Sequence, residues 1–198
     1  MIMRKMLGLM LLAASTPALA QLGQSDGYKF LEAVKEAKGA EATELLTKPG
    51  TTVINHKDYN SGETALHIVA KRGDALWTRF LLQKGADPNA RDGRGNTALL
   101  VAVTVGASDL VPILIAGKAN VNLANQSGET PLIRAVQRRD LRAIGELLKA
   151  GADPDQPDNL AGRSARDYAT EDTRFPQLAE AFKDVPKRSR RGLTGPTP

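Results

Sequence analysis

The chain has 198 residues, of which 41% are hydrophobic, 25% are charged and 4% are aromatic, which is ordinary for a globular protein. It contains no cysteine, so disulfides and thiol chemistry are excluded. The formal net charge of +5 comes from the two ends, because residues 21–186 hold 21 basic and 22 acidic groups. A basic face on the folded domain, which nucleic-acid binding requires, is therefore not indicated.

The first twenty residues have the three parts of a secretory signal peptide. Arg4 and Lys5 form a positive segment, residues 6–14 form an apolar run, and an A-x-A cleavage pattern ends at Ala20. The apolar run is about half the roughly 20 residues of a membrane-spanning helix. We therefore expect cleavage after Ala20, a periplasmic mature chain that does not contact a membrane, and a linker at 21–27.

All sulfur-containing residues lie in this leader. The four methionines are at positions 1, 3, 6 and 10, so the expected mature chain has neither methionine nor cysteine. Two interpretations stay open, namely a composition bias and a compartment in which oxidants reach the protein. Methionine oxidation disrupts cores, and a chain without methionine escapes that damage.

A repeat of 33 residues fills most of the chain. The segment GETAL at 62–66 recurs as GNTAL at 95–99 and as GETPL at 128–132. The second half of the unit keeps the same step, as FLLQKGADPN, ILIAGKANVN and ELLKAGADPD. A fourth copy begins one residue late, at Gly162.

This pattern resembles the ankyrin repeat, which is a turn followed by two antiparallel helices with a T-P-L-H-x-A signature. The resemblance covers residues 28–185 and implies an all-α ankyrin-repeat solenoid with hairpin-like fingers, in about five units including two caps. Together with the signal peptide, it indicates an ankyrin-repeat protein of the bacterial secreted or periplasmic kind. We expect the units at 28–58 (cap), 59–91, 92–124, 125–158 and 159–185 (cap). Residues 186–198 are basic and lack an apolar period, so we expect a disordered tail there.

Helix starts and ends can be placed within each unit. Thr64, Thr97 and Thr130 precede apolar residues at helical spacing and are predicted N-caps. Two positions that hold glycine in other units hold Lys118 and Arg139. At Lys118 we expect either an earlier helix end or a left-handed backbone.

His67 is the only histidine inside a repeat motif. It occupies the histidine position of T-P-L-H, where the resemblance implies a structural role that ties neighbouring loops by hydrogen bonds. His56 lies in a linker with no cysteine or second histidine nearby to complete a metal site. The phosphate-binding and nucleophile-elbow motifs are also missing. We therefore expect no catalytic residue, no metal, no cofactor and no enzyme activity.

The resemblance implies a concave binding surface made of the fingertips and the exposed sides of the first helices. The residues expected to bind the partner are Glu63, Lys71, Arg72, Arg91, Arg94, Asn96, Gln126, Glu129 and Arg138. Basic residues outnumber acidic ones in this set by five to two. We expect a monomer that binds an acidic protein surface through a strip containing Arg72, Arg94 and Arg138. A merely solvated charged face is the alternative.

Two functions are compatible with these features. The first is a periplasmic protein-interaction scaffold that supports a partner enzyme in stress or oxidant handling, for example a catalase. The second is an immunity-type protein that neutralises a toxin entering the periplasm.

Overall fold

The computed structural model describes residues 25–187. The expected signal peptide, most of the linker and nearly all of the basic tail therefore lie outside the described residues. Within the described range the chain forms α-helices and one 3-10 helix, with a single isolated β-bridge between Pro157 and Ser164 and no strand. No helix of this range is both long and apolar enough to cross a membrane.

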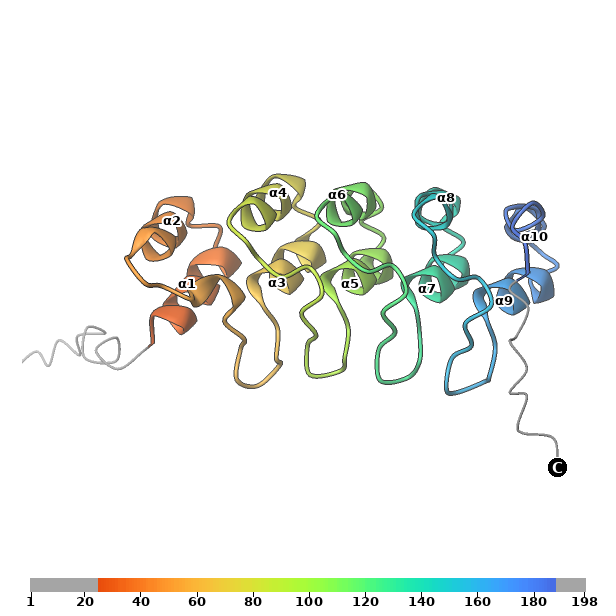
Figure 1. The fold of residues 1–198 in the computed structure, drawn as a ribbon, viewed down its shortest axis with the longest axis horizontal. Coiled ribbons are helices and arrows are strands. Elements are labelled where there is room, and N and C mark those ends of the chain that lie inside the picture. Colours follow the sequence, from red (N-terminus) through yellow and green to blue (C-terminus); the bar gives the residue numbers. More distant parts are fainter. Residues whose placement is uncertain (1–24, 188–198) are drawn as a thin grey trace, which may run out of the picture.

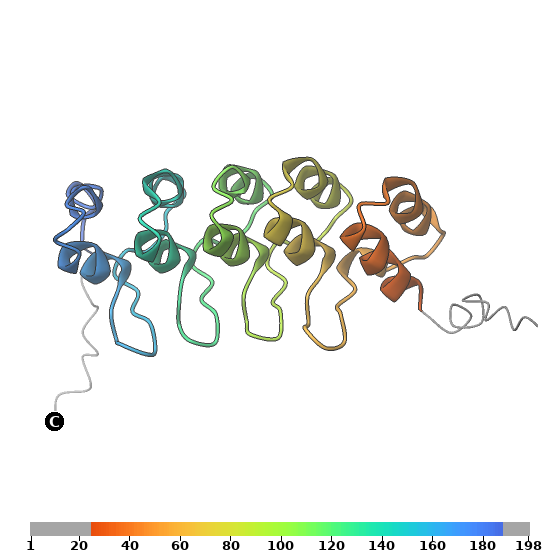
Figure 2. The ribbon, with the colours of Figure 1, turned by 180° about the vertical axis from the view of Figure 1, so that it is seen from behind.

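The helices pack in pairs that stack side by side along one axis, with four finger-like loops on one side (Figures 1 and 2). The helices next to the fingers form an inner row, α1 (Asp26–Lys35), α3 (Ala65–Arg72), α5 (Ala98–Val105), α7 (Pro131–Gln137) and α9 (Ala165–Glu171). The helices away from the fingers form an outer row, α2 (Gly39–Thr47), α4 (Ala75–Gln83), α6 (Leu110–Ala116), α8 (Leu141–Lys149) and α10 (Gln177–Glu180). The 3-10 helix η2 (Val53–Asn55) leads into the first finger. The predicted ankyrin-repeat solenoid is confirmed.

The predicted N-caps begin the inner helices. The Thr97 hydroxyl accepts a hydrogen bond from the backbone N–H of Leu100, and the Thr130 hydroxyl accepts one from Ile133. Thr64 forms a reciprocal capping arrangement with His67, three residues later. Each threonine thus satisfies a backbone donor that the first helical turn leaves unpaired.

Leucines at the 33-residue period form the continuous core. They are almost fully buried and stand in two rows, Leu66, Leu99 and Leu132 on the inner helices and Leu81, Leu114 and Leu147 on the outer helices. A single unit cannot bury the apolar face that these leucines form, so the units stabilise one another by stacking. Burying each leucine side chain contributes about 1.5–3 kcal/mol relative to leaving it exposed.

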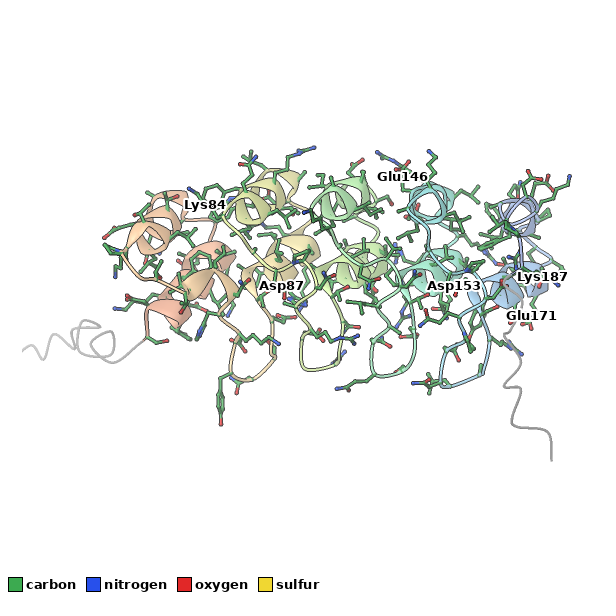
Figure 3. The ribbon with its side chains drawn as sticks, viewed as in Figure 1. Lys84, Asp87, Glu146, Asp153, Glu171 and Lys187 are labelled. Carbon is green, nitrogen blue, oxygen red and sulfur yellow. The ribbon has the colours of Figure 1, made fainter. Side chains whose placement is uncertain are left out.

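A ladder of asparagine side chains connects successive units at the base of the fingers. Asn55 accepts a hydrogen bond of 2.8 Å from the backbone N–H of Asp87, and Asn122 accepts one of 2.7 Å from Asp153. Asn89 makes the equivalent contact in the unit between them. Figure 3 labels Asp87 and Asp153 in these connecting segments. Each amide also donates to a carbonyl of the next unit, so a single side chain fixes the step between neighbours.

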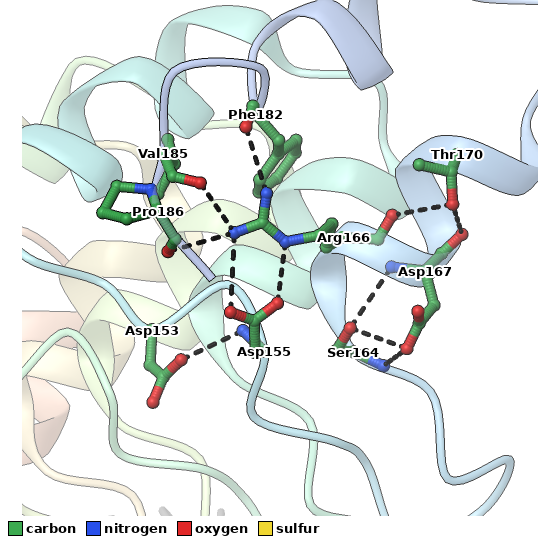
Figure 4. Close-up of polar contacts among 9 residues, drawn as sticks. All are labelled: Asp153, Asp155, Ser164, Arg166, Asp167, Thr170, Phe182, Val185 and Pro186. Atoms are coloured by element: carbon green, nitrogen blue, oxygen red, sulfur yellow. Dashed lines mark hydrogen bonds and ion pairs between the residues drawn. The ribbon is translucent and has the colours of Figure 1, made fainter. Parts of the chain in front are cut away.

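The ladder ends at the last unit, where an aspartate replaces the asparagine. Asp155 pairs with Arg166 of α9, with 2.7 Å between Oδ1 and Nε (Figure 4). The same guanidinium donates to the carbonyls of Phe182 and Val185 at 3.0 and 3.1 Å. Arg166 therefore holds the chain beyond α10 against the inner row, which closes the exposed end of the solenoid.

Two local expectations are refined by the structure. The domain begins before residue 28, because Ser25 caps α1 by accepting from the backbone N–H of Tyr28 at 3.2 Å. The helix before Lys118 does not end early, since α6 stops at Ala116, one repeat after Gln83 at the end of α4. Lys118 instead takes the left-handed backbone, with φ 69°, and Arg139 does the same with φ 58°. Both long side chains thus occupy positions that favour glycine.

Candidate functional site

A groove runs along the solenoid between the fingers and the inner helices. It encloses about 760 Å³ and crosses three successive units, from the α3 unit to the α7 unit. Its lining residues are Asn60, Ser61, Glu63, Lys71, Asp92, Gly93, Arg94, Asn96, Val101, Thr104, Val105, Asn125, Gln126, Ser127, Glu129 and Arg134.

Each end of the groove holds an ion pair. At the α3 end Lys71 pairs with Glu63, whose side chain is only 15% exposed. At the α7 end Arg134 Nη2 lies 2.9 Å from Glu129 Oε2, which also accepts from Asn125 Nδ2 at 2.9 Å. These four charges are therefore compensated before any partner arrives.

Between these ion pairs, the helix side of the groove is largely apolar. Helix α5 crosses it and carries no charged residue. Val101 is buried in the floor, Thr104 is exposed, and Val105 is 46% exposed. An exposed valine between two polar ends offers apolar surface to a partner side chain.

Arg94 lies in the finger above this apolar centre. It is exposed and makes no ion pair with any residue of the range 25–187. The nearby Asp92 carboxylate accepts hydrogen bonds from the backbone N–H groups of Arg94 and Asn96, each at 2.8 Å, and from Asn96 Nδ2 at 3.0 Å. Burial opposes ionisation of Asp92, but these hydrogen bonds hold its pKa below the ordinary value. Asp92 thus fixes the finger and leaves the Arg94 guanidinium facing solvent.

Most of the predicted site residues line this groove. They are Glu63, Lys71, Arg94, Asn96, Gln126 and Glu129. The finger positions and the exposed inner-helix positions of the repeat motif were therefore placed correctly in space. Binding by these residues stays a prediction.

Two predicted arginines lie outside the lining and bind backbone carbonyls instead. Arg72 Nη1 donates to Val34 of α1 at 2.8 Å. Arg91 Nη1 donates to Ala124 of the next unit at 2.6 Å. Each guanidinium links neighbouring units, so these two side chains stabilise the stacking of the repeats.

The expected single strip of arginines is not present. Arg72 ends α3 and Arg138 is the C-cap of α7, whereas Arg94 lies in a finger and lines the groove. The lining also contains three basic and three acidic side chains, so the five-to-two basic excess of the predicted set does not describe the groove. Arg94 is the basic residue that the groove itself leaves uncompensated.

His67 has the structural role that the repeat motif implied. It is fully buried, its Nδ1 accepts from the backbone N–H of Thr64 at 3.2 Å, and its Nε2 lies 2.9 Å from the Asn96 carbonyl oxygen. Because Nδ1 accepts, the network assigns the proton to Nε2, which donates to Asn96. Burial lowers the pKa of His67 below 6.5, although the Asn96 carbonyl opposes this change. His67 therefore joins helix α3 to the finger of the next unit.

The sequence reasoning missed several groove residues, among them Asp92, Val101, Asn125 and Arg134. Arg134 occupies the histidine position of the motif. In the α3 unit this position holds His67, which is buried. In the α7 unit the longer side chain of Arg134 reaches Glu129, while its Nε is buried without a hydrogen-bond partner in the described part of the chain. Glu129, five positions before Arg134, was the one feature of the sequence that could have indicated this ion pair. Residues 25–187 contain no cluster of three or more metal-ligand side chains.

A stack of helix pairs with a groove along its fingers defines a repeat-built binding scaffold. Residues 30–125 and 78–158 match the family described as ankyrin repeats (3 copies), and the chain belongs to this family. Ankyrin repeats generally mediate protein–protein interaction. Membership in the family thus agrees with both the repeat period and the observed solenoid.

Similar proteins share the repeats over a small part of their length. The human BCL-6 corepressor-like protein 1 is 37% identical over 131 residues, which are 66% of this chain and 7% of that protein. The neurogenic locus notch homolog protein 1 of Danio rerio is 35% identical over 121 residues, which are 61% of this chain and 5% of that protein. These relatives are animal proteins, and they lend no support to a bacterial periplasmic kind of ankyrin protein.

Proposed function

We propose that this chain is a non-enzymatic periplasmic scaffold that binds a protein partner in the groove between α3 and α7. The observation that carries this proposal is the centre of the groove. There Val105 is 46% exposed beneath a finger whose Arg94 has no ion-pair partner among residues 25–187. A partner that places an apolar side chain on α5 and a carboxylate at Arg94 satisfies both features.

The charge pattern favours recognition of a local acidic group over a broadly acidic surface. The ion pairs Lys71–Glu63 and Arg134–Glu129 neutralise both ends of the groove. Complementary charge then matters mainly at Arg94, where it sets the association rate and the register of the partner. The acidic partner surface expected from the predicted site residues is thereby narrowed to an acidic group that meets Arg94.

The outermost fingers extend the proposed contact beyond the groove. Tyr59 in the first finger is 100% exposed, and Leu160 in the fourth finger is 79% exposed. Asp158 accepts hydrogen bonds from the backbone N–H groups of Leu160, Ala161 and Gly162, so this fingertip is ordered. Large apolar side chains held at fingertips support a protein partner, because a small ligand in the groove would not reach them.

Periplasmic action is supported by the sequence of the leader. The signal-peptide pattern over residues 1–20 motivates export, and the sulfur-free mature chain motivates a partner that handles oxidants. N-terminal sequencing of the protein from a periplasmic fraction should begin at Gln21. Soluble cytoplasmic protein that retains Met1 would contradict the proposed location.

The groove is tested by comparing two matched charge reversals. Arg94→Glu alters the groove, and Arg138→Glu makes the same change one helix end away from it. Affinity purification from periplasmic extract, with mass spectrometry, should recover a partner with wild type and Arg138→Glu but much less with Arg94→Glu. Loss with Arg138→Glu alone would move the site to the helix ends. A recovered toxin would favour the immunity-type function.

A further inference from the structure

The outer face of the solenoid contains one unusual helix. Helices α4 and α8 carry charged side chains, including Arg79 on α4 and Arg142 and Glu146 on α8, and Figure 3 labels Glu146 on this row. Helix α6, with the sequence LVPILIA, has no polar side chain along its whole length. A helix with one solvent-facing side normally carries polar residues there. The composition of α6 therefore points to a covered face.

A groove of about 850 Å³ lies on this face between α4 and α6, and its lining combines aliphatic side chains with the charged Arg79, Asp109 and Arg142. Leu82 of α4 and Pro112, Ile113 and Ala116 of α6 contribute its apolar lining. Gly117 lets the two helices approach, because a Cβ atom there would lie 2.7 Å from Leu82 Cδ1. Leu82, Pro112 and Ile113 are half-buried, so each still presents apolar atoms to the solvent, and contiguous apolar surface of this kind commonly marks an interaction site.

We propose that a second copy of this chain docks on this face, with the two α6 helices antiparallel across a two-fold axis. The charges at the ends of α6 favour this occupant and this orientation. Asp109 directly precedes α6, and Lys118 follows its last turn, roughly 13 Å away at 1.5 Å per residue. In an antiparallel pair each Asp109 meets Lys118 of the other copy, whereas a parallel pair brings like charges together.

Both charged groups are accessible for this contact. Lys118 is exposed and forms no ion pair within residues 25–187. Asp109 pairs with Arg142 of the same chain, but the two side chains are 75% and 63% exposed. Such a surface pair contributes little to stability, and the carboxylate has a second oxygen for Lys118 of the other copy.

The proposed dimer replaces the monomer expected from sequence and does not rest on the proposed function. The outer helices lie on the side of the solenoid away from the fingers (Figure 1). Both finger-side grooves consequently remain open in the dimer. A dimer of this kind presents two partner-binding surfaces, which raises the avidity for a partner with repeated sites.

Sedimentation equilibrium of the purified chain tests the proposal directly. Wild type should change from the mass of one chain to that of two as its concentration rises. Asp109→Lys and Lys118→Asp should each raise the dimer dissociation constant roughly tenfold, because the two-fold axis counts each reversal twice. The double variant Asp109→Lys/Lys118→Asp should restore wild-type dimerisation, since it exchanges the two charges.

A matched control separates a specific pairing from a general charge effect. Lys84→Asp makes the same change at the end of α4, where the proposed pairing brings no opposing charge. It should leave the dimer constant within about twofold. Circular dichroism should show that every variant stays helical. A wild type that remains a single chain at all concentrations, or a double variant that is folded but not restored, would overturn the proposal.

Discussion

Replacing His67 measures how strongly one buried side chain holds a finger to the stack. His67→Leu keeps a side chain of similar volume, and the equivalent position of the next unit already holds Leu100, which is 2% exposed. The substitution leaves the Thr64 N–H and the Asn96 carbonyl without their partner. Each buried unsatisfied group costs about 1–3 kcal/mol, so we expect a loss of about 2 kcal/mol after partial rescue by water.

Urea denaturation followed by circular dichroism measures this loss. For a domain of this size about 2 kcal/mol corresponds to roughly 4–8 °C in melting temperature. His67→Ala should cost about 2 kcal/mol more than His67→Leu, because it also leaves a cavity. If His67→Leu is as stable as wild type, the hydrogen bonds between α3 and the next finger do not stabilise the fold. Equal losses for both variants would show that the packing of the side chain at position 67 does not stabilise the fold.

The remaining predictions concern the pH dependence of stability, the backbone at Ala37 and the side-chain contacts of Arg166. Because the pKa of His67 is lowered in the folded state, the unfolded chain binds the proton first as pH falls. The free energy of unfolding should therefore decrease as pH drops below about 6.5. Thermal melts at pH 7 and pH 5 should show this loss in wild type and less of it in His67→Leu. Ala37 has φ 56°, so Ala37→Gly should stabilise by about 0.5 kcal/mol, seen as a higher melting temperature. Arg166→Ala should cost about 2 kcal/mol by removing the pair with Asp155, and amide exchange should accelerate in residues 177–186 first.

The fold was largely predictable because short-range rules repeat in register. Thr97 and Thr130 indicate helix starts, because each hydroxyl accepts a hydrogen bond from the backbone N–H three residues later. The left-handed backbone at Lys118 was one of two alternatives that the sequence left open. It could be suggested because neighbouring units have glycine at the equivalent position. Such local signals do not depend on distant parts of the chain.

The site was less predictable because long side chains respond to neighbours in space. Arg72 occupies an exposed motif position, yet its guanidinium reaches a carbonyl of Val34, which is far away in sequence. Arg134 stands where the motif places a buried histidine, but it extends to Glu129 in the groove. Repeat register gives the position of a Cα atom and does not give the direction of a flexible cation. The charge balance of the groove therefore required the structure.

Site-specific photo-crosslinking tests the central claim, which is that the finger-side groove binds a protein partner. A photoreactive amino acid replaces Thr104, which is exposed on α5 in the groove, or Glu44, which is exposed on the outer helix α2. After illumination of cells that make the protein, the Thr104 position should yield a covalent adduct with a protein other than a second copy of this chain, and the Glu44 position should yield no such adduct. An adduct of that kind formed at Glu44 but absent at Thr104 would contradict the claim.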